Sequence, residues 1–185
     1  MRVSREEMER SHERIVQGAA RLFRKLGVEN TSVADVMESA GLTHGGFYRH
    51  FDTKDALVSA ALQAAFAQLK DVADRHLPGK DPEVALTHYH MYYLSEAHLG
   101  NPAAACPVAT LAGDIARATP ALKEEFGQGV MRILETLTNC QSGPKKERQS
   151  AAMREFAMLV GAAVIARASD PDTAKAVLAA CRSLA

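Results

Sequence analysis

The residues best suited to chemistry form one short stretch, which reads GLTHGGFYRHF over residues 41–51 and continues with Asp-Thr-Lys to residue 54. Its threonine, histidine, tyrosine, arginine and lysine side chains can donate hydrogen bonds to phosphates and base edges of nucleic acid. Phe47 and Phe51, spaced i, i+4, give a short helix one apolar face. The remaining residues form the expected contact set: Thr43, His44, Gly45, Gly46, Tyr48, Arg49, His50 and Lys54. The alternative is a helical corner whose polar face has no partner.

Two helices and a glycine turn are expected to position this stretch. Ser32, which we also expect to contact DNA, is placed to cap the first helix, and Asp35 completes a capping box with it. Gly41 can adopt the positive φ that ends this helix. Thr43 is then placed to cap the second, shorter helix. Helix, glycine turn and second helix form a helix-turn-helix, which presents its second helix to the major groove of DNA.

This order of residues resembles the DNA-binding domain of the tetracycline-repressor (TetR/AcrR) family of transcriptional regulators. The resemblance covers about residues 10–58 and rests on two motifs, Thr-Ser-Val-x-Asp-Val from Thr31 and Ala-Gly-Leu-Thr-x-Gly-x-Phe-Tyr-x-His-Phe-x-x-Lys from Ala40. It implies an all-α protein of about nine helices, with a three-helix helix-turn-helix DNA-binding domain at 1–53 and a helical regulatory and dimerisation domain at 54–185. It also implies a homodimer that binds palindromic, double-stranded operator DNA and is released by a small-molecule effector.

The residue types suggest a role for each expected DNA contact. We expect Tyr48 and Lys54 to hold phosphates, while His44 and Arg49 read base edges. Thr43 and the backbone at the two glycines would set the approach to the duplex.

Charge has to be supplied locally, because the chain carries 22 basic and 22 acidic residues, and its first 60 residues carry nine of each. Phosphate contacts dominate affinity for DNA. We expect Arg2, Arg5, Arg49 and Lys54 to supply positive potential, together with the helix N-termini at Ser32 and Thr43. No stretch of eighteen residues is continuously apolar, so no membrane span is expected. The polar N-terminus and three widely separated cysteines predict a cytoplasmic protein.

Apolar periodicity and proline or glycine breaks predict further helices. The expected ranges are about 6–26, 54–75, 82–99, 107–117, 120–140, 145–168 and from 171 onward, with a break at 78–82.

The expected effector site lies in the C-terminal part, where three of the four tyrosines lie on one predicted helix. Tyrosine combines apolar area with a polar tip, which suits a pocket wall as well as an ordinary core. An apolar or aromatic effector is expected against some of the following residues: Tyr89, Tyr92, Tyr93, Cys106, Phe126 and Met131. The histidines of this helix are spaced i, i+2 and do not share a face, so no metal site and no cofactor are expected.

Cys106 carries a second hypothesis, because it precedes an expected helix N-terminus. That position could lower the pKa of its thiol and make it a redox or electrophile sensor. The alternative is a small, buried, apolar residue.

The last two predicted helices are expected to form the dimer interface. The helix over 145–168 is apolar on nearly every side in its second half, which requires cover on every side. Two copies of this helix pair would pack as a four-helix arrangement about a two-fold axis. The expected interface residues are Phe156, Val160, Ala163, Val164, Val177 and Leu178.

No enzymatic motif is present, since the chain lacks a phosphate loop, a G-x-S-x-G elbow and an H-E-x-x-H pair, so we do not expect an enzyme. Three classes of function remain: a ligand-responsive dimeric repressor, a DNA-binding dimer without an effector, and a helical small-molecule binder or enzyme with a vestigial helix-turn-helix. Retention of Thr43, Tyr48, His50 and Lys54 argues against the third class.

Overall fold

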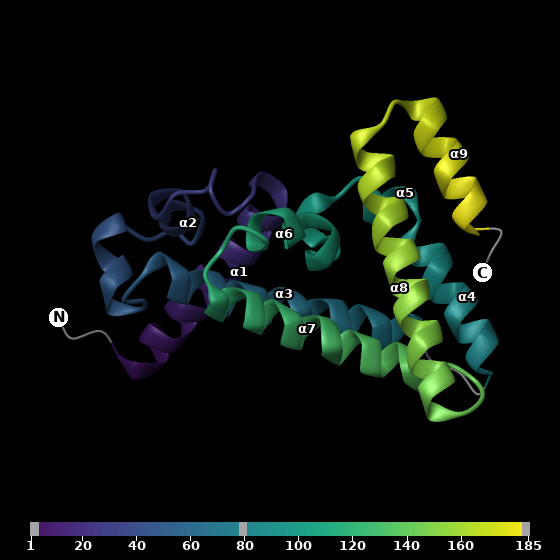
Figure 1. Ribbon diagram of the computed structural model, residues 1–185. Coiled ribbons are helices and arrows are strands. Elements are labelled where there is room, and N and C mark those ends of the chain that lie inside the picture. The colour runs from purple at the N-terminus through teal and green to yellow at the C-terminus, as the bar shows by residue number, and fades with distance from the viewer. Residues whose placement is uncertain (1–3, 78–80, 183–185) are drawn as a thin grey trace.

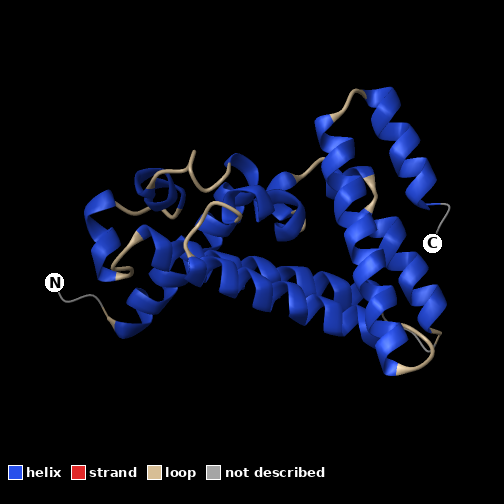
Figure 2. Cartoon of the chain, viewed as in Figure 1, coloured by secondary structure: helices blue, strands red, loops and turns tan. Residues whose placement is uncertain are grey.

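The computed structural model describes residues 4–77 and 81–182, and within these ranges every regular element is a helix (Figure 2). The expected all-α fold is confirmed. The α-helices are α1 Arg5–Leu26, α2 Val33–Ser39, α3 Lys54–His76, α4 Pro82–Tyr93, α5 Glu96–Leu99, α6 Pro107–Ile115, α7 Pro120–Asn139, α8 Lys145–Ala168 and α9 Pro171–Arg182. Two short 3-10 helices, η1 His44–Arg49 and η2 Pro102–Ala104, complete the described elements.

Helices α3 and α7 run side by side and connect the two ends of the molecule (Figure 1). At one end, α1 and α2 form a small unit with η1. At the other end, α8 crosses the α3–α7 pair, and α9 folds back along α8. None of the described helices is long and apolar enough to cross a bilayer.

Local signals set the ends of the N-terminal helices as expected. Ser32 Oγ accepts from the backbone N–H of Asp35 at 3.1 Å, and the Asp35 carboxylate accepts from the Ser32 N–H at 2.7 Å, so the capping box is present. Thr53 caps α3 through the N–H of Ala56. Gly27 and Gly41 have φ of 89° and 69°, the left-handed region in which a Cβ is strained.

The single helix expected over 82–99 is wrong, because two helices occupy this range. Ser95 has extended backbone angles, and its hydroxyl accepts from the N–H of His98 at 3.2 Å. A serine side chain that caps a new helix competes with continuation of the old one. Of the expected break over 78–82, residues 78–80 lie outside the described residues; α3 ends at His76 and α4 begins at Pro82.

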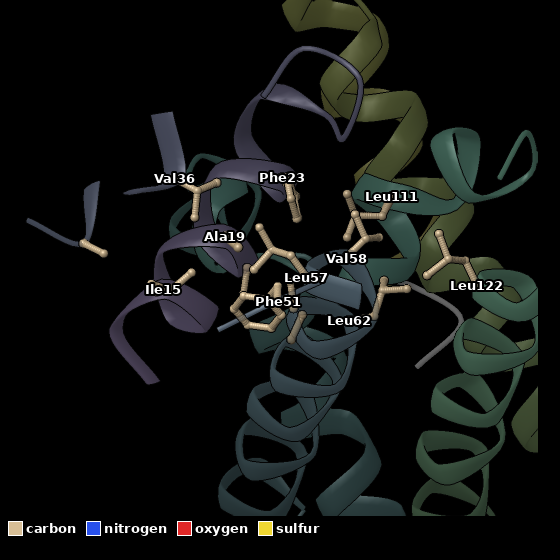
Figure 3. Close-up of a cluster of buried hydrophobic side chains, with 14 of the residues drawn as sticks. Ile15, Ala19, Phe23, Val36, Phe51, Leu57, Val58, Leu62, Leu111 and Leu122 are labelled. Carbon is tan, nitrogen blue, oxygen red and sulfur yellow. The ribbon is translucent and has the colours of Figure 1, made fainter. Parts of the chain in front are cut away.

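The first of two apolar clusters holds α1, α2 and η1 against the first half of α3. Figure 3 shows Ile15, Ala19 and Phe23 of α1 close to Leu57 and other side chains of α3. Leu111 and Ile115 of α6 and Leu122 of α7 belong to the same cluster. The second cluster joins the rest of α3 to α4, α7 and α8. Since α3 contributes to both clusters, it connects the two ends mechanically. The expected boundary between a DNA-binding domain at 1–53 and a regulatory domain at 54–185 stays a prediction.

Candidate nucleic-acid interface

The short helix η1 is fixed by its apolar side. The Phe47 side chain is only 2% exposed, and its ring lies 5.8 Å from that of Phe51 in a stacked arrangement. Tyr48, the next residue, is 70% exposed, with its ring set edge-on against Phe47. The buried phenylalanines therefore hold a polar surface in a fixed orientation.

The structure places most of the expected contact residues on this one exposed surface. Thr43, His44, Gly45, Tyr48 and Arg49 are exposed, while Gly46 and His50 are half-buried. Nothing within the described chain occupies the space a Cβ would take at Gly45. A partner can therefore approach the backbone closely at this point.

The expected cap by Thr43 is wrong, because its hydroxyl makes no capping hydrogen bond. The turn is closed by backbone alone: the N–H of Gly46 donates to the Thr43 carbonyl at 3.0 Å. A 3-10 turn makes i to i+3 bonds of this kind without a side chain. The exposed hydroxyl of Thr43 is thus free to meet a partner.

A residue that the sequence did not single out, His12 of α1, supports this surface from behind. Its ring stacks on Phe51 at 4.7 Å and lies 5.9 Å from the ring of His50. Partial burial, followed by the nearby His12 and Arg49, lowers the pKa of His50. The neutral form of His50 is therefore favoured on this surface until a phosphate comes close.

Lys54 lies beside this surface but already has a partner within the chain. Its Nζ donates to the carbonyl of Val28 at 2.8 Å. The N–H of the same residue, Val28, donates to Asp114 Oδ2 at 2.9 Å. The peptide groups at Val28 thus hold the α1–α2 loop to both α3 and α6. A phosphate contact by Lys54 stays a prediction, whereas this internal role was not anticipated.

Asp114→Ala is expected to weaken the attachment of the α1–α2 loop to α6. The substitution leaves the Val28 N–H without its charged acceptor, which typically costs about 1–3 kcal/mol in free energy of unfolding. Urea denaturation monitored by circular dichroism measures the change. Arg117→Ala is the matched control, because it removes only the ion pairs of a side chain that is 60% exposed, with Asp114 and Glu29. That control should change stability by less than about 0.5 kcal/mol. Equal losses for the two variants would show that Asp114 acts through its ion pair.

Arg24 of α1 forms a second connection between α1 and the rest of the chain. This charged residue is only 5% exposed. Its guanidinium donates to the carbonyl of Ala105 at 3.2 Å and to Gln68 Oε1 at 2.6 Å. Burial lowers the pKa of Arg24 to about 10. Arg24 thus ties α1 to α3 and to the segment that precedes Cys106. Nothing in the sequence pattern distinguished it from the exposed arginines of the same helix.

One interior region contains or borders four of the six expected effector residues, Tyr89, Tyr92, Tyr93 and Cys106. Tyr89, Tyr93 and Cys106 are fully buried, with the two tyrosine rings 5.8 Å apart. Tyr92 is half-buried and stacks on His76. Phe126 lies between the two apolar clusters, edge-on to Phe66.

Met131 does not belong to this interior, and its assignment to a pocket wall is wrong. Its side chain is 56% exposed on the outer side of α7. Gly129 and Ile133 of the same helix are buried, so α7 turns another side inward. Periodicity alone does not say which of two adjacent stripes faces the core.

The expected activation of Cys106 is also wrong. Complete burial raises the pKa of its thiol, and this effect outweighs the opposing influence of the nearby Tyr93 hydroxyl and of the backbone at Ala109 and Val108. A thiol with a raised pKa carries little of the reactive thiolate. Cys106 has the environment of a small core residue.

The expected dimer residues divide into two groups. Phe156 and Ala163 are buried within their own chain, so assigning them to a contact with a second chain is wrong. They pack in the second cluster, and Val160, Val177 and Leu178 are partly buried against it. Val164 is 45% exposed and remains available for contact with a second chain. Two further apolar side chains of α8 that were not anticipated, Met153 and Ile165, are each 47% exposed.

Side chains that could bind a metal do not gather: across 4–77 and 81–182, no three His, Cys, Asp or Glu residues are arranged to hold an ion.

Comparison with known proteins places the N-terminal surface in context. A family model described as "Bacterial regulatory proteins, tetR family" matches residues 15–61. The chain is 41% identical over 64 residues to the HTH-type transcriptional regulator TtgR of Pseudomonas putida, a match that covers 35% of this chain and 30% of that protein. It is 35% identical over 75 residues to the HTH-type transcriptional repressor Rv3405c of Mycobacterium tuberculosis, covering 40% of each. The matches thus span less than half the length of these relatives.

Solved structures resemble the chain over nearly its whole length. A TetR transcriptional regulator from Chloroflexus aurantiacus J-10-FL matches with a TM-score of 0.80 and 25% identity, over 98% of this chain and 94% of that one. A TetR-family transcriptional regulator from Cytophaga hutchinsonii matches with the same TM-score and 21% identity, over 100% of this chain and 96% of the other. At these identities the agreement over the C-terminal helices concerns the fold.

Proposed function

Because this chain belongs to the TetR family of bacterial regulatory proteins, we propose that it is a transcriptional repressor that binds double-stranded operator DNA as a homodimer and is released by a small-molecule effector. The observation that carries this proposal is the exposed polar surface of η1, held in place by the buried Phe47. A rigid short helix with exposed donors and an open glycine backbone suits the major groove.

Each exposed group on η1 has a role in this proposal. Arg49 donates through a planar fork that fits the O6 and N7 acceptors of guanine, and His44 reads a neighbouring base edge. Tyr48 and Thr43 hold phosphates through their hydroxyl groups. Because the first 60 residues have balanced charge, this short surface must supply much of the attraction. Arg5 contributes less than expected from its charge, since it pairs with Glu9 at 2.9 Å. Arg2 lies outside the described residues.

The contacts made by Asp114 and Arg24 would allow a change at the effector site to move the DNA-binding surface. The Asp114 carboxylate holds the α1–α2 loop from α6, and Arg24 holds the segment before α6 from α1. An effector that binds more tightly to another arrangement of α6 would shift this equilibrium. The recognition helices of the two chains would then lose the spacing that successive major grooves require.

Dimerisation through α8 and α9 is supported by the apolar side chains left uncovered on one chain. Met153, Val164 and Ile165 of α8 are each about half exposed, although they lie on a helix that also lines the core. Large uncovered apolar side chains that cluster on one element mark an interaction surface.

The test of this proposal is selection of binding sites from random duplex DNA with the whole protein, followed by affinity measurements on the winner. An enriched inverted repeat would support the dimeric repressor. Absence of any enriched sequence would contradict it.

Arg49→Ala is expected to relax the selected sequence at one position of each half-site, because it removes a bidentate base contact worth about 1–3 kcal/mol of discrimination. Affinities of wild type and variant for the selected site and for single-base variants of it measure the effect. Arg14→Ala on the exposed side of α1 is the control. A uniform loss of affinity across all sequences would identify Arg49 as a phosphate contact instead.

A further inference from the structure

The structure contains an open groove between α5, the end of α8 and α9, away from the interior tyrosines. Its volume is about 650 Å³, which lies within the range of small-molecule sites. Its apolar lining comes from Leu99, Ala166, Leu178 and neighbouring alanines. Three cations, Arg167, Lys175 and Arg182, and one acid, Glu96, also line it. The groove therefore has an apolar lining and a net positive charge.

Arg167 is the unusual member of this set, because its charge has no partner. Its Nε and Nη2 are buried and make no hydrogen bond with any residue in the described ranges. These two nitrogens lie on one edge of the guanidinium plane, the edge that pairs side-on with both oxygens of a carboxylate. Arg167 as a whole is half-buried, but donors that are removed from water and left unpaired are costly. A carboxylate placed against this edge would therefore be held at a defined position.

The positive charge of Arg167 acts on its surroundings, where His98 is kept neutral. Burial lowers the pKa of His98 to about 4, with further contributions from the nearby Arg167 and Arg24. His98 Nε2 and the Tyr89 hydroxyl are also buried without a hydrogen-bond partner in the described ranges. Helices α4, α5 and α8 thus each carry a buried polar atom that has no partner in the described ranges.

We propose that this groove binds a small organic carboxylate, with the carboxylate paired to Arg167 and the apolar body lying against Leu99 and Leu178. The proposal names the chemical class of the effector and so rests on the proposed regulatory function. Arg167 Nε and Nη2 make no hydrogen bond within the described ranges, so turning this edge of the guanidinium into the groove breaks none. Lys175 adds positive charge at the mouth, whereas Arg182 is already engaged with the carbonyl of Leu94.

The experiment is isothermal titration calorimetry of the whole protein, without DNA, using 2-naphthoate and its neutral analogue 2-naphthamide. The two probes share an apolar body and differ in the charged group. We expect the carboxylate to bind at least about tenfold more tightly, the size of one charge-assisted contact. Arg167→Gln should remove this preference and leave binding of the amide unchanged. Arg154→Gln, at an exposed position on the same helix, is the matched control and should bind both probes as the wild type does.

Three results would overturn the proposal: equal affinity for the two probes, an unchanged preference in Arg167→Gln, or a change in association state on Arg167→Gln without any loss of 2-naphthoate binding. The last result, measured by sedimentation velocity, would assign the groove to a second copy of the chain. Since Arg167→Gln removes a half-buried charge whose Nε and Nη2 have no partner in the described ranges, the variant should be about as stable as the wild type in urea. Binding of the selected DNA site without any probe tests the repressor separately, so failure of one proposal does not conceal failure of the other.

Discussion

Phe47→Ala is expected to lower the free energy of unfolding by about 3–5 kcal/mol and to abolish operator binding. The Phe47 ring is 2% exposed, stacks with Phe51 and belongs to the first apolar cluster. Removing it leaves a cavity directly beneath the surface that carries His44 and Arg49. Urea denaturation at fixed protein concentration measures the stability, and titration with the selected site measures DNA binding.

The neighbouring Tyr48→Ala is the matched control, because this side chain is 70% exposed. It should change the free energy of unfolding by no more than about 0.5 kcal/mol. It should nevertheless weaken DNA binding by about tenfold, through loss of a phosphate contact. Comparison of these two adjacent substitutions would then distinguish the residue that stabilises the recognition helix from the residue that contacts DNA. Normal DNA binding by Phe47→Ala would contradict this account of η1.

The second large effect is expected at the crossing of α3 and α7, the pair that connects the two ends of the molecule. A Cβ placed on Gly129 would lie 2.3 Å from Cδ2 of Phe66 and 2.4 Å from its Cε2. The ring cannot move aside freely, because it is 4% exposed and packs edge-on against Phe126. Gly129→Leu is therefore expected to cost about 3 kcal/mol by overpacking. The midpoint of urea denaturation measures this loss.

Gly127, two residues earlier in α7, provides the opposite case. No atom lies within 4 Å of the position its Cβ would take. Gly127→Ala should therefore stabilise the protein by about 0.5–1 kcal/mol, the difference in helix propensity between the two residues. Loss of stability in both variants would mean that α7 needs glycine for its backbone rather than for the approach of Phe66.

Much of the fold followed from local sequence signals. The bounds of α1, α3, α7 and α8 agree with expectation to within a residue or two, because caps, glycine stops and proline starts act over a few residues. The exposed set on η1 also followed from its residue types and from the two phenylalanines beneath it. The break at Ser95 was missed, since a serine is compatible both with a helix interior and with a helix cap. The packing of neighbouring segments decides between the two conformations.

The sequence by itself determined the helices, their caps and the composition of the recognition surface, because these depend on contacts within a few residues. Only the tertiary structure decided which stripes of α7 and α8 face inward, and it turned Met131 outward while burying Phe156 and Ala163. It also gave Lys54 a partner 26 residues away and Val28 a partner 86 residues away. A helical period shows which residues share a face, but the segment that covers the face is chosen by the packing of the whole chain.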